Sequence, residues 1–326
     1  MTPHLQTTRL APSPTGDLHL GNARSLLLCW ALGRSLGWQV LLRIEDLDGT
    51  RCDPKWETLI LEGLRWLGID WDGPVVRQSD ELTKYQQAMA ALDVDDRVFT
   101  CTRSRREVRA AAEAAGAPHE DGRKTISTPA MRPEDASRFR FEPGDCNHRL
   151  VIEPGKETVH DECVGRHAFE LSTQFGDPIV WTRENTPSYQ LAVVTDDLEQ
   201  GITDVVRAAD LLPSAGLQQA LAGMLRGTAP RWWHLPLLLD HDGRRLAKRD
   251  GDHTLSACRV GGVSPERVIG LLARTCEMQE DASPMSLEQF LNAFDADQLC
   301  EWAGRIGVDG ETRLQADDIT TLMETP

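Results

Sequence analysis

The order of apolar and polar positions predicts strands and helices in turn. An apolar strand at residues 7–11 leads into a Pro/Gly loop and then a helix at 21–36, where apolar residues recur at helical spacing. Gly37 follows directly, as glycine often does at helix ends. A second apolar strand at 40–42 runs into the sequence Arg43-Ile-Glu-Asp46. This βαβ order predicts a parallel sheet.

The residue composition and the predicted elements change after a second predicted helix at 54–68. The segment at about 75–179 contains an alanine-rich helix at 105–115, a Gly/Pro/Asp/Lys-rich stretch and short strands such as 149–152. Parallel-sheet patterning then resumes at 179–181 and 191–194, followed by a strand at 202–207 and a helix at 217–225. An apolar, extended run at 235–239 leads into a polar loop at 240–252. The middle segment is therefore predicted to be an insertion.

The last part of the chain is predicted to be helical from its capping signals. Ser264 followed by Pro265 fits a helix start, and Ser286 with Gln289 fits a capping box. The predicted fold class is α/β, a Rossmann-like parallel sheet with an inserted α+β domain. The expected parts are 1–75 and 179–255 as the two halves of a nucleotide-binding fold, 76–178 as the insertion, and 256–326 as a helical segment.

Composition narrows the class of protein. Hydrophobic residues make up 40% and charged residues 26% of 326 residues, which is ordinary for a globular protein with a core. No apolar run approaches the ~20 residues of a membrane span, and the first residues lack the apolar region of a secretory signal. A cytoplasmic enzyme with no membrane partner is expected. The net charge of −16 argues against a non-specific nucleic-acid binder, although basic clusters occur at 103–106 and 244–249.

The eight cysteines are scattered and include no C-x-x-C pair. In a chain of this length, the pattern favours reduced and mostly buried thiols over a disulfide framework.

The strongest chemical signal is the string RLAPSPTGDLHLGN at residues 9–22. It predicts a strand, a tight loop and a helix start, and helix N-termini suit phosphate because their N–H groups are free to bind it. His19 lies just before the helix, where it can donate to phosphate oxygens as charge develops. Gly21 lets a nucleotide approach the backbone. A lone His-x-Gly would indicate only a surface loop, but the whole string is far more specific.

This string is similar to the first signature of glutamyl-tRNA synthetases and of their shortened relatives, the glutamyl-queuosine tRNA(Asp) synthetases, in the class I aminoacyl-tRNA synthetase family. The family's second histidine is replaced by Asn22. The run RLAKR at 245–249 resembles the family's Lys-Met-Ser-Lys-Ser loop. Lys248 matches the lysine that neutralises departing pyrophosphate, Arg245 keeps a charge, and Ala247 and Arg249 depart from the pattern. The resemblance covers about residues 7–250.

The resemblance implies a glutamate pocket and an ATP site. Arginine binds carboxylates well and an acidic side chain suits the ammonium group. A single arginine such as Arg207 could equally form a structural salt bridge, but two arginines favour glutamate over glutamine because a neutral amide would leave their charge unpaired. The implied glutamate-binding residues are Arg9, Leu10, Ala11, Pro12, Ser13, Glu45, Tyr189 and Arg207. The implied ATP-binding residues are His19, Gly21, Asn22, Arg245 and Lys248, of which His19, Gly21 and Lys248 are expected to be catalytic.

The cofactors implied are ATP and Mg²⁺. Many shortened relatives also carry zinc in the inserted domain, held by a C-x-C pair and a later Tyr and Cys. Here Cys101 remains and Phe99 occupies the other place. One cysteine, even with His119, does not make a tetrahedral site. We therefore expect no zinc, and a buried thiol at Cys101.

The expected reaction is ATP-dependent activation of L-glutamate and its transfer to the queuosine base in the anticodon loop of tRNA(Asp). The segment after Arg249 is too short for the helical anticodon-binding region of a full glutamyl-tRNA synthetase. One alternative is an enzyme that charges the 3′ end of tRNA(Glu). Another is a non-catalytic paralogue that binds a partner or senses glutamate. The retention of His19 and Lys248 argues against the second alternative.

Overall fold

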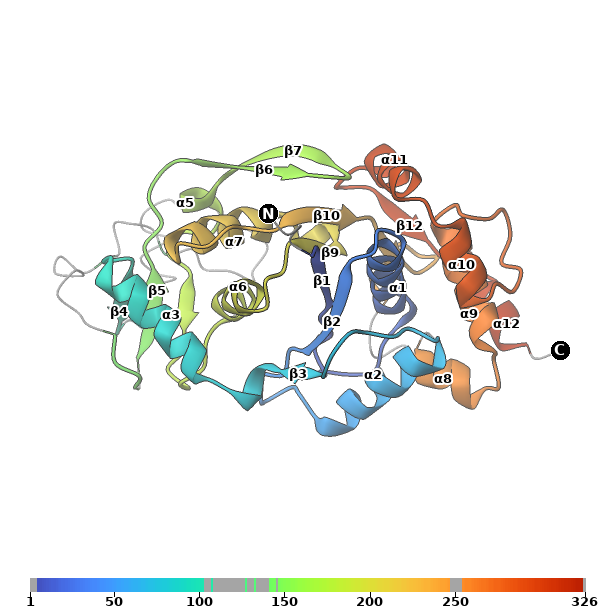
Figure 1. Cartoon of the computed structure of the whole chain (residues 1–326), viewed down its shortest axis with the longest axis horizontal. Helices are drawn as coiled ribbons and strands as arrows, with labels where there is room; N and C mark the ends of the chain where they lie inside the picture. Colours follow the sequence, from blue (N-terminus) through green and yellow to red (C-terminus); the bar gives the residue numbers. More distant parts are fainter. Residues whose placement is uncertain are drawn as a thin grey trace.

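Two sheets, one parallel and one mixed, meet edge to edge at the centre of the molecule (Figure 1). The computed structural model describes residues 5–102, 107, 127, 132, 141–144, 146–246 and 254–324. The first sheet has the order β1 (Thr7–Leu10), β2 (Gln39–Ile44), β3 (Val76–Arg77), with all strands parallel. Helices α1 (Leu20–Ser35) and α2 (Pro54–Trp66) connect them. The predicted βαβ start is confirmed.

The second sheet has the order β9 (Asp204–Ala208), β10 (Arg231–Leu235), β6 (Lys156–Asp161), β7 (Gly165–Glu170). Strands β9, β10 and β6 are parallel, and β7 returns antiparallel to β6. The amide of Thr203 donates to the carbonyl oxygen of Thr7 at 2.9 Å, which places β1 beside β9. From β1 the chain continues to β2 on one side, and from β9 it continues to β10 on the other side. In α/β folds such a switch point opens a crevice at the carboxyl ends of the strands.

The inserted segment is built from helices and a small antiparallel sheet. Its elements are η1 (Gln78–Asp80), α3 (Thr83–Val94), α5 (Leu171–Gln174) and the strands β4 (Val98–Cys101), β5 (Asn147–Leu150) and β8 (Ile179–Trp181). Strand β5 pairs with both β4 and β8 in antiparallel fashion. The insertion is not separate from the main fold, because its strand β6 pairs with β10.

Two expectations for the second half of the fold were wrong. Residues 179–181 pair antiparallel with β5, so they belong to the inserted sheet and not to a parallel one. Residues 191–194 lie in helix α6 (Tyr189–Glu199). Short apolar runs do not distinguish a buried strand from a buried helix, and all four residues here are buried in the second core. Helix α7 (Leu212–Met224), preceded by η4 (Ala209–Leu211), packs against α6.

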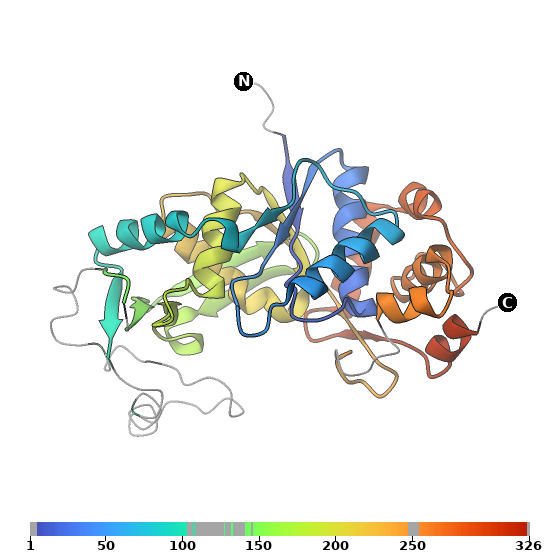
Figure 2. The ribbon, with the colours of Figure 1, turned by 90° about the horizontal axis from the view of Figure 1, so that it is seen from below.

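The C-terminal segment forms a helical layer at the end of the molecule opposite β4 (Figure 2). It contains α8 (Leu255–Val260), α9 (Pro265–Thr275), α10 (Leu287–Ala293), α11 (Ala296–Ile306) and α12 (Asp318–Met323). Ser264 caps α9, and both hydrogen bonds of the Ser286 capping box are present, so these predictions are confirmed. The segment also supplies an unpredicted strand, β12 (Glu311–Arg313), parallel to β11 (Leu237–Leu239).

The expectation of reduced cysteines was wrong for one pair. Cys163, in the turn between β6 and β7, forms a disulfide with Cys300 of α11 across a sequence separation of 137 residues. Such a pairing is invisible in cysteine spacing because it depends on how the C-terminal layer packs against the second sheet. No helix in the described parts of the chain is long and apolar enough to cross a membrane.

Candidate active site

A cavity of about 460 Å³ opens at the carboxyl ends of β1 and β9, beside the N-terminus of α1. It occupies the switch point where ligands bind in α/β folds. Most of the residues implied by the sequence line it: Arg9, Ala11, Pro12, Ser13, His19, Asn22, Glu45, Tyr189 and Arg207. Side chains from the first 50 residues and from residues near 200 therefore meet in one place.

His19 is the N-cap residue of α1, as predicted from its place before the helix. Its Nδ1 atom accepts from the amide of Asn22 at 3.2 Å. In the neutral ring this leaves the proton on Nε2, which can donate to an anion in the cavity. The N-terminal amides of a 16-residue helix add a positive dipole end at the same point. This corner of the cavity suits phosphate.

Three of the described residues implied by the sequence lie outside the cavity lining: Leu10, Gly21 and Arg245. Leu10 is fully buried in the core. Gly21 lies against the His19 ring, and a Cβ there would approach Nδ1 of His19 to 3.1 Å and the carbonyl oxygen of Leu238 to 3.4 Å. The structure thus shows a packing reason for glycine at 21: a side chain would press on the histidine.

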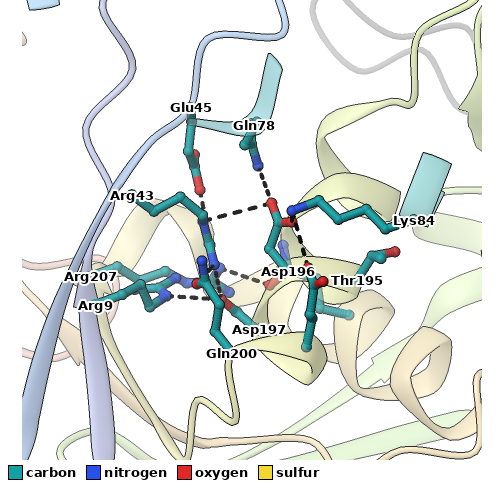
Figure 3. Close-up of polar contacts among 12 residues, drawn as sticks. Arg9, Arg43, Glu45, Gln78, Lys84, Thr195, Asp196, Asp197, Gln200 and Arg207 are labelled. Atoms are coloured by element: carbon teal, nitrogen blue, oxygen red, sulfur yellow. Dashed lines mark hydrogen bonds and ion pairs between the residues drawn. The ribbon is translucent and has the colours of Figure 1, made fainter. Parts of the chain in front are cut away.

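A buried network of charges forms the floor of the site (Figure 3). Asp197 of α6 accepts from Nε of Arg9 at 3.2 Å and from Arg43 at 2.7 Å. Arg43 also donates to Glu45 at 3.1 Å. Although burial acts to raise it, Arg43 and Arg9 hold the pKa of Asp197 below its ordinary value. Burial raises the pKa of Glu45, and the two arginines offset this only in part.

Arg207 of β9 has a different environment. It donates from Nε to Nε2 of His234 at 3.0 Å, and from its two other nitrogens to Gln218 at 2.8 Å and to the carbonyl oxygen of Leu211 at 3.1 Å. Its guanidinium lies 4.8 Å from the centre of the Trp232 ring. None of the ion pairs among the described residues includes Arg207. Burial lowers the pKa of Arg207, although Tyr189 and the carboxylate of Asp197 act in the opposite direction.

The network contains residues that the sequence analysis missed. Asp196 is fully buried and accepts from Gln78 at 2.7 Å and from the Tyr85 hydroxyl at 3.0 Å, and Lys84 lies 2.7 Å away. Asp197 and Arg43 were also not assigned. Two adjacent aspartates after an apolar run were the available signal, but interpreting that run as a strand separated them from the site.

The loop that carries the second signature lies mostly outside the described residues, and Lys248 falls there. Its described flanks are near the cavity. Arg245 is exposed and pairs with Asp210 at 3.0 Å, while Thr254 forms a β-bridge with His19. Ser256 donates to Asp17 of the first signature. The segment that follows the second signature therefore contacts the first signature, although Ser256 and Asp17 are 239 residues apart in sequence.

Among the described residues, no group of three or more His, Cys, Asp or Glu side chains could hold a metal ion. Cys101 is buried at the end of β4. Because His119 and most of residues 103–145 lie outside the described chain, the expectation about zinc stays a prediction.

Comparison with known proteins decides the family. The model for the catalytic domain of class I tRNA synthetases (E and Q) matches residues 6–304. The chain belongs to this family. It is 41% identical to a glutamyl-Q tRNA(Asp) synthetase of Rhodobacter capsulatus, over 81% of this chain and 99% of that protein. A glutamyl-Q tRNA(Asp) synthetase of Nocardia farcinica is also 41% identical, over 81% of this chain and 82% of its own length.

A solved structure confirms the class I synthetase fold. The glutamate tRNA ligase of Elizabethkingia meningosepticum, in complex with its amino acid, matches with a TM-score of 0.77 at 26% identity. The match covers 97% of this chain and 68% of that one. The predicted fold class is confirmed, and this class I synthetase is a ligase.

Proposed function

We propose that this synthetase activates L-glutamate with ATP and transfers it to queuosine in tRNA(Asp). The observation that carries the first half is Arg207, a buried guanidinium beside the cavity whose acceptors are all uncharged. A buried charge without a counter-charge is costly unless a ligand supplies one. A carboxylate is the matching ligand, since guanidinium binds it with two parallel hydrogen bonds.

The rest of the floor fits an amino acid with two carboxylates. Glu45 offers an acidic group for the ammonium, and Arg9 adds a second guanidinium at the cavity. A side chain ending in a neutral amide would leave Arg207 without its counter-charge. Glutamate therefore fits better than glutamine, and the tyrosine ring of Tyr189, which is 43% exposed at the cavity, covers the bound amino acid.

The proposed activation step is an in-line displacement. An oxygen of the α-carboxylate of glutamate bonds to the α-phosphorus of ATP, and the bond from that phosphorus to the bridging oxygen breaks, releasing pyrophosphate. His19 Nε2 and the N-terminus of α1 stabilise the charge that develops on the phosphate. Lys248 neutralises the departing pyrophosphate. Mg²⁺ would enter as the complex with ATP and would neutralise charge on the phosphates.

The acceptor is proposed from the relatives. The matched proteins of Rhodobacter capsulatus and Nocardia farcinica are glutamyl-Q tRNA(Asp) synthetases. In the second step a hydroxyl of the queuosine base attacks the activated carbonyl carbon, and AMP leaves. The glutamate is then joined to the tRNA through an ester.

ATP–pyrophosphate exchange tests the activation step. Purified protein with Mg²⁺ is assayed with glutamate, glutamine and aspartate, with and without tRNA. Exchange should require glutamate and should vanish in Lys248→Ala. Lys55→Ala is the matched control, because Lys55 is an exposed lysine whose ammonium contacts Asp53 and the Trp56 ring at the surface. No exchange with any amino acid, with or without tRNA, would indicate a non-catalytic binding protein.

Transfer of labelled glutamate tests the acceptor. The substrates are tRNA(Asp) with queuosine, the same tRNA without it, and tRNA(Glu). Label should appear only on the first, and mild alkali should release it as expected for an ester. Label on tRNA(Glu) instead would show that the enzyme charges 3′ ends.

A further inference from the structure

Arg207 does not reach its position alone. Its Nε donates to Nε2 of His234, a fully buried residue on the neighbouring strand β10. His234 does not line the cavity, so it does not touch the amino acid directly. Its ring holds the guanidinium from behind, and the Trp232 ring lies against the guanidinium face.

The opposite side of the His234 ring faces Asp161 of β6. Nδ1 of His234 lies 2.6 Å from an oxygen of Asp161. Both side chains are fully buried. Asp161 also accepts from the amides of Cys163 at 3.0 Å and Val164 at 2.9 Å, so the turn after β6 fixes its orientation.

These contacts select one tautomer of His234. An ionised carboxylate can only accept, so the proton of the neutral ring must be on Nδ1. Nε2 then presents a lone pair, which is what the Nε–H of Arg207 requires. The hydrogen bonds from Asp161 through His234 to Arg207 therefore have a fixed direction. The neutral imidazole ring separates the negative charge of Asp161 from the guanidinium of Arg207.

We propose that His234, oriented by Asp161, is a positioning residue that determines specificity for glutamate. It fixes Arg207 with an uncharged acceptor, so the guanidinium faces the cavity with its charge available to the substrate carboxylate. A carboxylate at the position of His234 would hold Arg207 equally well, but it would compensate the positive charge of the guanidinium. Glutamine, whose side chain is a neutral amide, would then compete with glutamate for the pocket. This inference rests on the proposed activation of glutamate.

Two isosteric variants separate the roles of the two ring nitrogens. In His234→Gln the amide oxygen can occupy the place of Nε2 and still accept from Arg207. In His234→Asn the amide occupies the place of Nδ1, keeps the contact with Asp161 and leaves Arg207 without its acceptor. We expect the KM for glutamate to rise about tenfold to hundredfold in His234→Asn and only a few-fold in His234→Gln. The KM for ATP should stay within a few-fold in both.

Asp161→Asn tests the directional argument without removing a side chain. An amide NH₂ facing Nδ1 would favour the opposite tautomer, which places an N–H against the N–H of Arg207. The KM for glutamate should rise as in His234→Asn. In His234→Glu the preference for glutamate over glutamine in pyrophosphate exchange should fall at least tenfold, because Arg207 is neutralised.

A spectroscopic readout is made on the wild-type protein itself and needs only one variant, for assignment. In ¹⁵N-histidine-labelled wild-type protein at pH 7, with His234→Gln for assignment, His234 should show a protonated Nδ1 and an unprotonated Nε2. The opposite tautomer or an imidazolium would overturn the proposal. Equal effects of Asn and Gln on the KM values for glutamate and ATP would also overturn it, by showing a purely structural role. Failure of the proposed function is distinct, since wild-type protein would then show no glutamate-dependent exchange at all.

Discussion

Arg43 and Asp197 form a 2.7 Å ion pair that joins β2 to α6, with the arginine fully buried and the aspartate side chain 9% exposed. Asp197 also receives Nε of Arg9. One carboxylate therefore compensates two guanidiniums that come from neighbouring strands. Removing it would take away the carboxylate that pairs with Arg9, while Arg43 would keep Glu45 at 3.1 Å and Asp196 at 3.8 Å. Loss of one partner from a buried ion pair is strongly destabilising.

Asp197→Ala should lower the free energy of unfolding by about 3–5 kcal/mol, since both arginines lose their shared partner. Urea unfolding followed by circular dichroism measures the loss. Asp95→Ala is the matched control, because Asp95 pairs with the exposed Arg226 at the surface. It should cost less than about 1 kcal/mol. Equal losses in the two variants would contradict the view that Asp197 anchors the floor of the site.

Gly21→Ala should separate stability from activity. Alanine favours helix over glycine by up to ~1 kcal/mol, so the variant should be no less stable than wild type. Its Cβ would press on the His19 ring, however, at 3.1 Å from Nδ1. A shift of a catalytic group by a fraction of an ångström should lower kcat for pyrophosphate exchange at least tenfold. Gly223→Ala in α7, where a Cβ meets nothing within 4 Å, should leave kcat unchanged.

Protonation of His234 should make stability depend on pH. Burial lowers the pKa of His234 to about 4, although the hydrogen bond to Asp161 acts in the opposite direction. The unfolded chain takes up this proton near pH 6.5, whereas the folded protein resists it until about pH 4. Stability should therefore be full above pH 6.5 and fall by about 3 kcal/mol as the pH drops to 4.

Urea unfolding at intervals between pH 4.5 and 7.5 measures this slope. His234→Gln has no titrating group at this position. Its free energy of unfolding should therefore fall less steeply with pH in the same range, by a slope that corresponds to at most one bound proton. Parallel curves for the two proteins would show that other groups cause the acid sensitivity.

The bridge between Cys163 and Cys300 should stabilise the folded protein. Closing a long loop restricts the unfolded chain, and native disulfides typically contribute about 2–4 kcal/mol. Cys300→Ser should lose that amount, and dithiothreitol should lower the stability of the wild type to the same level. The variant itself should be insensitive to dithiothreitol. A wild type that does not respond to reductant would indicate that the two thiols are not joined in solution.

Much of the fold follows from local signals in the sequence. The loop before α1, the glycine after it and the capping residues of α9 and α10 each depend on neighbours within four positions, and all were predicted correctly. The same holds for His19, whose place is set by the start of its helix. Features of this kind can be predicted from the sequence because they depend only on near neighbours.

The errors and omissions concern partners that are far apart in sequence. Whether 191–194 is a strand or a helix depends on the surfaces that bury it. The role of Asp197 depends on arginines 154 and 188 residues away, and the link from Asp161 to His234 spans 73 residues. Periodicity and spacing carry no information about such pairings, so the network behind the pocket emerges only from the three-dimensional structure.

Because the residues of the charge network are far apart in sequence, the ribosome synthesises them at different times. Arg9 and Arg43 leave the ribosome well before Asp197, and the 154 residues between Arg43 and Asp197 take about 8 to 30 s to synthesise at common elongation rates. During that interval the two arginines of the first sheet have no carboxylate from α6 to pair with. The amino-acid pocket is therefore a late product of synthesis, and a nascent chain stopped before α6 has no complete floor on which to hold glutamate.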